Sequence, residues 1–350
     1  MPPLRAIATR TIRWKRVVTL AAIAAVFLAI PPLAHLPAHL VTACAKWIAL
    51  AAALELLSIL GFVLAFALVF GRRLGARERI GAGLRALGAS TVLPAGGLIG
   101  PVVAAQTASV EARPLPALTQ SMVALTILTN APGLLVLGGL GFALWLGWLP
   151  GPHTALLTLP AAGVATAIVA GAWLVGRPFQ PRHTSDRKQP RSKRRRHLSA
   201  TATTCRHGAV EARRLVADRN WKLAGAVGYY AFDNAVLWAA FQAYGRGPAI
   251  SVIVMAYLVG SLGALLPLPA GIGGVEGGLI GALVLYGAPA APAAGAVLLY
   301  RGISLSLQVG LGALAWGLVP ARWLRSARRR RARVPSIPAT ASRPAPASLK

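Results

Sequence analysis

The chain has 350 residues, of which 56% are hydrophobic and only 13% are charged, a composition unlike that of a typical soluble globular protein. Its 37 Lys and Arg residues outnumber its eight Asp and Glu residues and give a net charge of +29. A soluble nucleic-acid-binding protein could have this charge, but here apolar stretches of membrane length separate the basic clusters, which excludes that class.

The N-terminal region favours an uncleaved membrane span. Residues 1–16 are basic, and the apolar segment 17–30 follows them. A signal peptide is the alternative, but the small-residue run at 42–45 lies too far beyond the apolar segment for good cleavage. The second span is expected over 47–70. A basic stretch, 72–88, follows it as either a linker or an interfacial helix.

The middle of the chain contains one interrupted apolar segment and two uninterrupted ones. The interrupted segment is 89–105, with Pro and Gly at its centre, and the spans are expected over 118–146 and 154–175. The basic insert 177–220 comes next. It has few apolar residues, so we expect no packed structure in it, disorder around 185–197, and little contribution to the fold.

Four further apolar segments complete the expected membrane domain. They are 221–243, 250–266, 275–286 and 293–319, and the third is too short to cross a bilayer alone. The remaining residues are basic and then rich in Pro, Ser and Ala, which is typical of disorder. We therefore expect a transmembrane domain over 17–320, between a cytoplasmic N-terminus (1–16) and a disordered cytoplasmic tail (321–350).

Positive charge predicts the topology, because cytoplasmic loops of membrane proteins are enriched in Lys and Arg. Four clusters, at 5–16, 72–85, 177–222 and 322–350, hold 33 of the 37 basic residues. All four can be cytoplasmic only if 89–105 enters and leaves the membrane on the same face. The sequence thus predicts an all-α polytopic membrane protein with about eight spans, a re-entrant segment and both termini in the cytoplasm.

The most unusual stretch is 266–278, Leu-Pro-Leu-Pro-Ala-Gly-Ile-Gly-Gly-Val-Glu-Gly-Gly, which interrupts an apolar region. Proline breaks the helical hydrogen-bond ladder, and glycine permits backbone conformations closed to other residues. In hydrocarbon, such backbone survives only where it is packed in protein or lines a wet cavity. Glu276 in this break is therefore a candidate functional residue. The residues expected to shape the break are Pro267, Pro269, Gly271, Gly273 and Gly274.

A second break repeats the first. The sequence Leu-Pro-Ala-Gly occurs at 93–96 and again at 268–271, about half the chain apart. Paired Pro/Gly interruptions in two halves of a membrane chain point to the binding site of a transporter built from repeats. Pro94, Gly96 and Gly97 are therefore candidate site residues in the first half. The sequence predicts two related halves with a site between them.

The stretch 266–278, together with Val-Leu-Leu-Tyr-Arg-Gly at 297–302, resembles the signature of the transmembrane, flippase-type domain of lysylphosphatidylglycerol synthases. The resemblance covers roughly residues 15–320 and implies movement of a phospholipid or lipid-linked headgroup between leaflets of a bacterial plasma membrane. Many relatives carry Glu and Arg after the first Pro-Gly, whereas residues 97–103 here are uncharged, so the role of that acidic site does not transfer.

The resemblance also sets an expectation about what is missing. Full-length synthases carry a soluble aminoacyl-transferring domain, and only about 30 residues of disordered composition follow the last expected span here. We therefore expect a stand-alone member of the family that does not itself make aminoacylated lipid.

Charged residues inside the apolar segments are the remaining candidates, because bilayer-centre charge is costly. Glu276 and Arg301 carry opposite charges. They form either a structural pair that holds the broken segment against the last span, or polar contacts for a lipid headgroup or a coupled proton. Asp233 and Asn234 lie near two tyrosines, whereas Glu55 suits a structural role nearer an interface. We expect Glu276 to matter more for activity than for folding.

Two other functions stay open, and several sites are not supported. The first is a membrane-embedded enzyme acting on a lipid-linked donor, with Asp233 or Glu276 as general base. The second is a non-catalytic partner of a separate synthase or glycosyltransferase. The basic run at 191–196 favours anchoring to anionic lipid over nucleic acid. His35 and His39 do not support a metal site, and neither a nucleophile elbow nor a Walker motif occurs, so we expect no cofactor.

Overall fold

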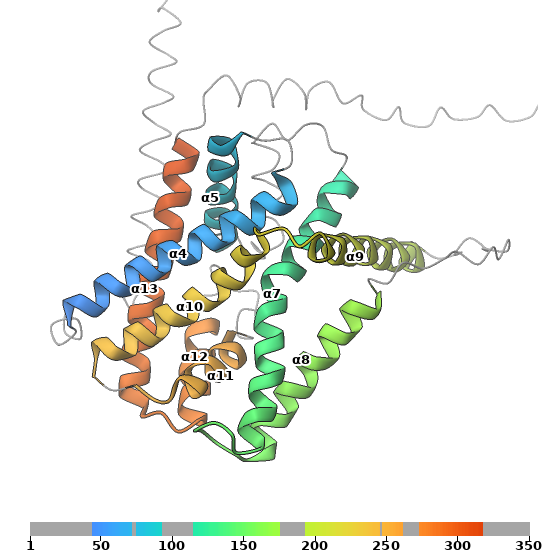
Figure 1. The fold of residues 1–350 in the computed structure, drawn as a ribbon. Helices are drawn as coiled ribbons and strands as arrows, with labels where there is room; N and C mark the ends of the chain where they lie inside the picture. Colours follow the sequence, from blue (N-terminus) through green and yellow to red (C-terminus); the bar gives the residue numbers. More distant parts are fainter. Residues whose placement is uncertain are drawn as a thin grey trace, which may run out of the picture.

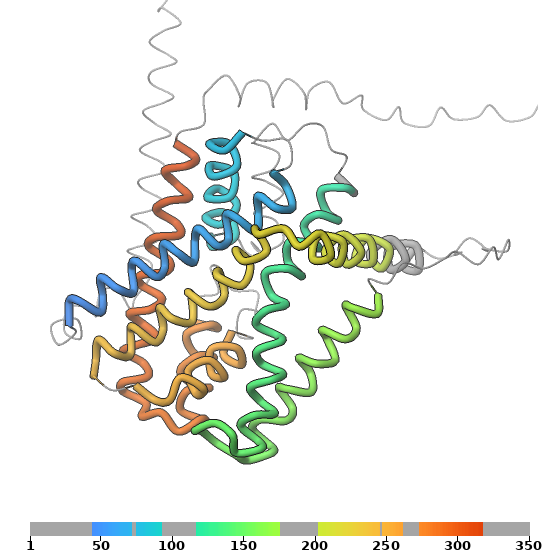
Figure 2. The backbone as a smooth tube through the Cα atoms, in the orientation of Figure 1, coloured from blue at the N-terminus to red at the C-terminus, as the bar shows by residue number. Residues whose placement is uncertain are grey.

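The computed structural model describes residues 44–71, 75–92, 115–175, 193–245, 247–261 and 273–317, and almost all of these residues lie in helices (Figure 1). Figure 2 traces the same path from the N-terminal to the C-terminal helices. The helices are α4 (Ala45–Phe70), α5 (Ala76–Val92), α7 (Leu115–Trp145), α8 (Ala155–Val175), α9 (Lys193–Ala217), α10 (Leu223–Ala243), α11 (Ile250–Gly260), α12 (Gly274–Leu285) and α13 (Ala290–Gly317).

The all-α polytopic membrane fold is confirmed. Within the described residues, α4, Ala117–Trp145 of α7, α8 and α13 are each long and apolar enough to cross a membrane. The helices α11 and α12 are apolar but shorter. The expected first span at 17–30, the centre of the expected re-entrant segment and the tail lie outside the described residues, so the number of spans and the re-entrant path stay predictions.

The helices α4 and α10 form the centre of the molecule, where they cross in antiparallel directions (Figure 1). The Cys44 N–H donates to the Ala243 carbonyl at 3.1 Å, which joins the start of α4 to the end of α10. Farther along, Gly61 and Gly225 bring the two backbones together. A Cβ atom on Gly61 would lie 2.7 Å from the Gly225 carbonyl oxygen, so glycine is required for this approach.

The helix α5 packs along α13 in the antiparallel direction. The Arg85 guanidinium donates to the Ala315 carbonyl at 3.4 Å, and the Thr91 hydroxyl donates to the Gln308 side-chain oxygen at 2.8 Å. Ala82, Ala86 and Leu87 are among its buried residues. The expectation of a linker over 72–88 is therefore wrong for the described part of this stretch, because small residues seat the helix α5 against α4 and α13, and its place at a membrane interface stays a prediction.

Helices from the second half of the chain make matching contacts, with the helix directions reversed. Leu258 of α11 lies against Gly133 of α7, and the Ser251 hydroxyl donates to the carbonyl of Pro150, just beyond α7, so α11 and α7 are antiparallel. The helices α7 and α13 also run in opposite directions (Figure 1). Contacts of α4 with α5 and α7 are matched by contacts of α10 with α11 and α13. These matched contacts, with the helix directions reversed, are those that an inverted repeat would give, and they agree with the prediction of two related halves.

Part of the basic insert is a packed helix, contrary to expectation. In α9, Ala209, Ala212 and Leu215 are buried, and Gly208 lies against Val123 of α7. The Ser121 hydroxyl donates to the Glu211 carboxylate at 3.4 Å. The prediction of no packed structure is thus wrong for the part of α9 whose side chains are described, 202–217, because small residues allow close contact without a large apolar face. Most of the stretch expected to be disordered, 185–192, lies outside the described residues.

Candidate functional site

A polar stripe runs along the middle of α13, the last described helix. It consists of Tyr300, Arg301, Ser304 and Gln308, in an otherwise mainly apolar sequence. Residues four apart lie on one face of a helix, so these side chains follow each other along about 12 Å of the helix axis. We call these four residues the α13 stripe. Each of them bonds a carboxylate from another helix.

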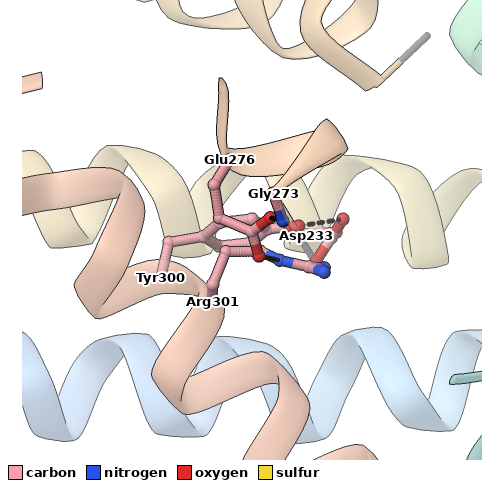
Figure 3. A network of polar contacts seen from close by, with 5 residues as sticks. All are labelled: Asp233, Gly273, Glu276, Tyr300 and Arg301. Atoms are coloured by element: carbon pink, nitrogen blue, oxygen red, sulfur yellow. Dashed lines mark hydrogen bonds and ion pairs between the residues drawn. The ribbon is translucent and has the colours of Figure 1, made fainter. Parts of the chain in front are cut away.

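Glu276 and Arg301 form an ion pair. The Arg301 Nε donates to Glu276 Oε1 at 2.7 Å, and the Gly273 N–H donates to Glu276 Oε2, also at 2.7 Å (Figure 3). Gly273 has φ +84°, a backbone conformation that favours glycine. Since α12 begins at Gly274, Glu276 caps the helix start and ties it to α13. The structural pair that the sequence left open is therefore formed.

Asp233 lies in the middle of α10 and is only 6% exposed. Its Oδ2 accepts hydrogen bonds from the Tyr257 hydroxyl of α11 and from the Tyr300 hydroxyl of α13, the latter at 3.0 Å. Figure 3 shows the Tyr300 contact beside the Glu276–Arg301 pair. Its Oδ1 is buried and has no hydrogen-bond partner among the described residues. Buried polar atoms are normally satisfied, so this oxygen is available to water, a proton or a ligand.

Asn234 takes a different role from its neighbour. Its side-chain nitrogen donates to the Tyr230 carbonyl at 3.0 Å, within α10. The Tyr230 ring packs edge-on against that of Tyr257, with 5.8 Å between ring centroids. Asn234 thus bonds within its own helix, and Tyr257 connects this region to Asp233.

Glu55 is fully buried, with 0% exposure, and lies against the α13 stripe. Its carboxylate accepts hydrogen bonds from Ser304 Oγ at 3.0 Å and from Gln308 Nε2 at 2.9 Å. Gln308 in turn accepts the hydrogen bond from Thr91 of α5. The α4–α10 crossing places Glu55 in the protein interior, and its depth relative to a membrane interface stays a prediction.

Three carboxyl groups therefore bond to the α13 stripe, which contains one cation, Arg301. Glu55 and Asp233 interact electrostatically with each other, and both interact with Arg301. Among the described residues, Arg301 forms an ion pair with Glu276. Glu55 and Asp233 instead accept hydrogen bonds from hydroxyl or amide groups. We call Glu55, Asp233, Glu276 and Arg301 the carboxylate cluster. Buried charge of this kind is expensive and needs partners.

The structure brings together charged residues that are far apart in the sequence. Gly273 and Gly274 shape the start of α12 beside the cluster. The candidates Pro94, Gly96, Gly97, Pro269 and Gly271 lie outside the described residues. Sequence reasoning missed Tyr257, Ser304 and Gln308, although polar residues four apart in an apolar span were a usable signal. In the described part of the chain, no group of His, Cys, Asp and Glu could hold a metal ion.

Fold and site together define a multi-pass helical membrane protein with a buried polar cluster. Residues 14–312 match the family described as Lysylphosphatidylglycerol synthase TM region, and the chain belongs to this family. The matched range includes every residue of the carboxylate cluster. A comparison with curated proteins found no match.

Proposed function

We propose that this protein moves the polar headgroup of a phospholipid, or of a lipid-linked precursor, between the two leaflets of a membrane. The observation that supports this most directly is the carboxylate cluster, buried among apolar helices on the α13 stripe. A headgroup cannot cross hydrocarbon without losing its hydrogen bonds, so it needs a polar path. The cluster offers one cation for a phosphate and carboxylates for an ammonium group.

Two short helices beside the cluster support the same proposal. With 11 and 12 residues, α11 and α12 are each only about 16–18 Å long, against about 30 Å of hydrocarbon. They meet closely, since a Cβ atom on Gly260 would lie 2.6 Å from Cα of Leu279. Tyr257 and Glu276 come from these helices. Discontinuous helices of this kind line the substrate sites of many transporters built from inverted repeats.

The lipid-movement proposal is tested in liposomes that contain the purified protein and a trace of fluorescent phosphatidylglycerol. A membrane-impermeant quencher should reach nearly all of the lipid when protein is present, and only the outer leaflet in protein-free liposomes. The variant Asp233→Asn should slow the movement, whereas Glu78→Gln, on an exposed part of α5, should not. Formation of a new lipid product would support a membrane-embedded enzyme. Absence of both movement and product would favour a partner of a separate synthase or glycosyltransferase.

We further propose that the protein lies in a bacterial plasma membrane with both termini and α9 on the cytoplasmic side, where basic residues contact anionic lipid headgroups. Two exposed cysteines test this orientation, Cys44 before α4 and Cys205 on α9. An impermeant thiol reagent added to intact cells should label the variant that retains only Cys44 and spare the one that retains only Cys205. The reverse pattern would invert the whole topology.

A further inference from the structure

The hydrogen bonds of Asp233 are divided unevenly between its two carboxyl oxygens. Oδ2 accepts from the Tyr257 and Tyr300 hydroxyls, whereas Oδ1 is buried and has no hydrogen-bond partner among the described residues. An ionised carboxylate spreads its charge over both oxygens, and a buried charge without a partner is far more costly than a buried neutral O–H. A carboxylic acid fits this pattern, because its carbonyl oxygen has two lone pairs for the two hydroxyls and its proton lies on the other oxygen.

Glu55 shows the opposite pattern, with one donor for each oxygen. Ser304 Oγ donates to Oε2 at 3.0 Å, and Gln308 Nε2 donates to Oε1 at 2.9 Å. Donors on both oxygens favour the ionised form of a carboxyl group. Because Glu55 and Asp233 interact electrostatically, a charge on Glu55 opposes a second charge on Asp233. The proton of this pair therefore belongs on Asp233.

The other ionisable groups around Asp233 are mostly neutral tyrosines. The groups that interact with it are Tyr257 on α11, Tyr300 and Arg301 on α13, Glu55 on α4, and Tyr229 and Tyr230 on α10. The helix α7 also packs against α10, and it contains no ionisable side chain. The cation in this set, Arg301, forms an ion pair with Glu276, which offsets its charge.

We propose that Asp233 carries a proton on Oδ1, and that one release and one rebinding of this proton accompany each headgroup that crosses the membrane. On release, the bond from Oδ1 to hydrogen breaks and the proton passes to water. On rebinding, the proton comes from water on the opposite side. Carboxyl groups that carry protons in membrane transporters lie inside the membrane, as Asp233 does on α10. The coupling rests on the proposed function, whereas the position of the proton does not.

Infrared spectroscopy of the purified full chain tests the position of the proton, whether or not lipid moves. At neutral pH, in a detergent without ester groups, the wild type should show the carbonyl band of a neutral carboxylic acid. The band should be missing in Asp233→Asn, whose amide has the shape of the neutral acid, and present in the exposed control Glu78→Gln. No such band in the wild type, or a band that persists in Asp233→Asn, would overturn the inference.

A second measurement makes the assignment if Asp233→Asn does not fold. Wild-type protein with heavy carbon in the carboxyl groups of its aspartates should show the carbonyl band at lower frequency. Heavy carbon in the glutamates should leave the band where it was. A shift with labelled glutamates alone would place the proton on a glutamate and overturn the inference.

The coupling is tested in liposomes with a pH gradient, fluorescent phosphatidylglycerol and a potassium ionophore that holds the membrane potential at zero. One proton for each lipid should drive the two leaflets to an unequal distribution of the labelled lipid, up to about tenfold for each pH unit. Protein-free liposomes with the same gradient give the background. Asp233→Asn should move the lipid slowly to an equal distribution, and Glu78→Gln should behave as the wild type.

The outcomes separate this inference from the proposed function. Wild-type protein that moves the lipid rapidly to an equal distribution, despite the gradient, would overturn the coupling and leave the proposed function standing. Absence of lipid movement with and without the gradient would remove the proposed function and the coupling with it. The infrared band would then still decide whether Asp233 holds the proton.

Discussion

Replacing Arg301 by glutamine is expected to destabilise the protein by about 3–5 kcal/mol, because it leaves a buried carboxylate without its cation. Glu276 would lose its ion pair, and Glu55 and Asp233 would lose the positive charge with which both interact. The measurement is thermal or denaturant unfolding of purified protein, together with the amount that accumulates in membranes. We expect Arg301→Gln to accumulate poorly.

Replacing the partner residue, Glu276, by glutamine should destabilise the protein less than Arg301→Gln does. In Glu276→Gln the single amide oxygen can still accept the hydrogen bond from Arg301, although the one from Gly273 is lost, and Arg301 keeps Asp233 and Glu55 as nearby carboxyl groups. The double variant Glu276→Gln/Arg301→Gln should recover much of the stability lost in Arg301→Gln. Equal losses in the two single variants would contradict this asymmetry. The sequence-based expectation that Glu276 matters more for activity than for folding would then also fail.

Replacing Gly61 by leucine is expected to separate α4 from α10 and to cost more than about 3 kcal/mol. A Cβ atom at this position would lie 2.6 Å from the Tyr229 backbone nitrogen and 2.7 Å from the Gly225 oxygen, so two backbones would have to move. The crossing holds both Glu55 and Asp233 against α13, so lipid movement should fall together with stability.

A matched control is available on α7. Gly139 is exposed, and a Cβ atom there would meet no other atom within 4 Å, so Gly139→Leu should leave unfolding and lipid movement unchanged. Comparison of the two leucine variants separates the close helix approach from the general effect of replacing a helical glycine. If Gly61→Leu unfolds at the wild-type temperature, α4 and α10 do not approach each other as described.

The sequence by itself determined the class of protein and most of its described spans. The expected segment 47–70 corresponds to α4, 154–175 to α8 and 221–243 to α10, each within a few residues. Hydrophobicity over membrane length is a local property of the chain, so it can be predicted without tertiary contacts. The family was also correctly predicted, because the two stretches that carry the resemblance, 266–278 and 297–302, are short runs that can be recognised without tertiary contacts.

Only the tertiary structure decided which polar residues meet. Arg301 follows Tyr300 directly in the sequence, yet Tyr300 bonds Asp233 while Arg301 bonds Glu276. Glu55 meets Ser304 from a position almost 250 residues away. These partners depend on how each helix is rotated about its axis and where it crosses its neighbours. Small residues such as Gly61 and Gly225 set those crossings through close packing, which hydrophobicity does not encode.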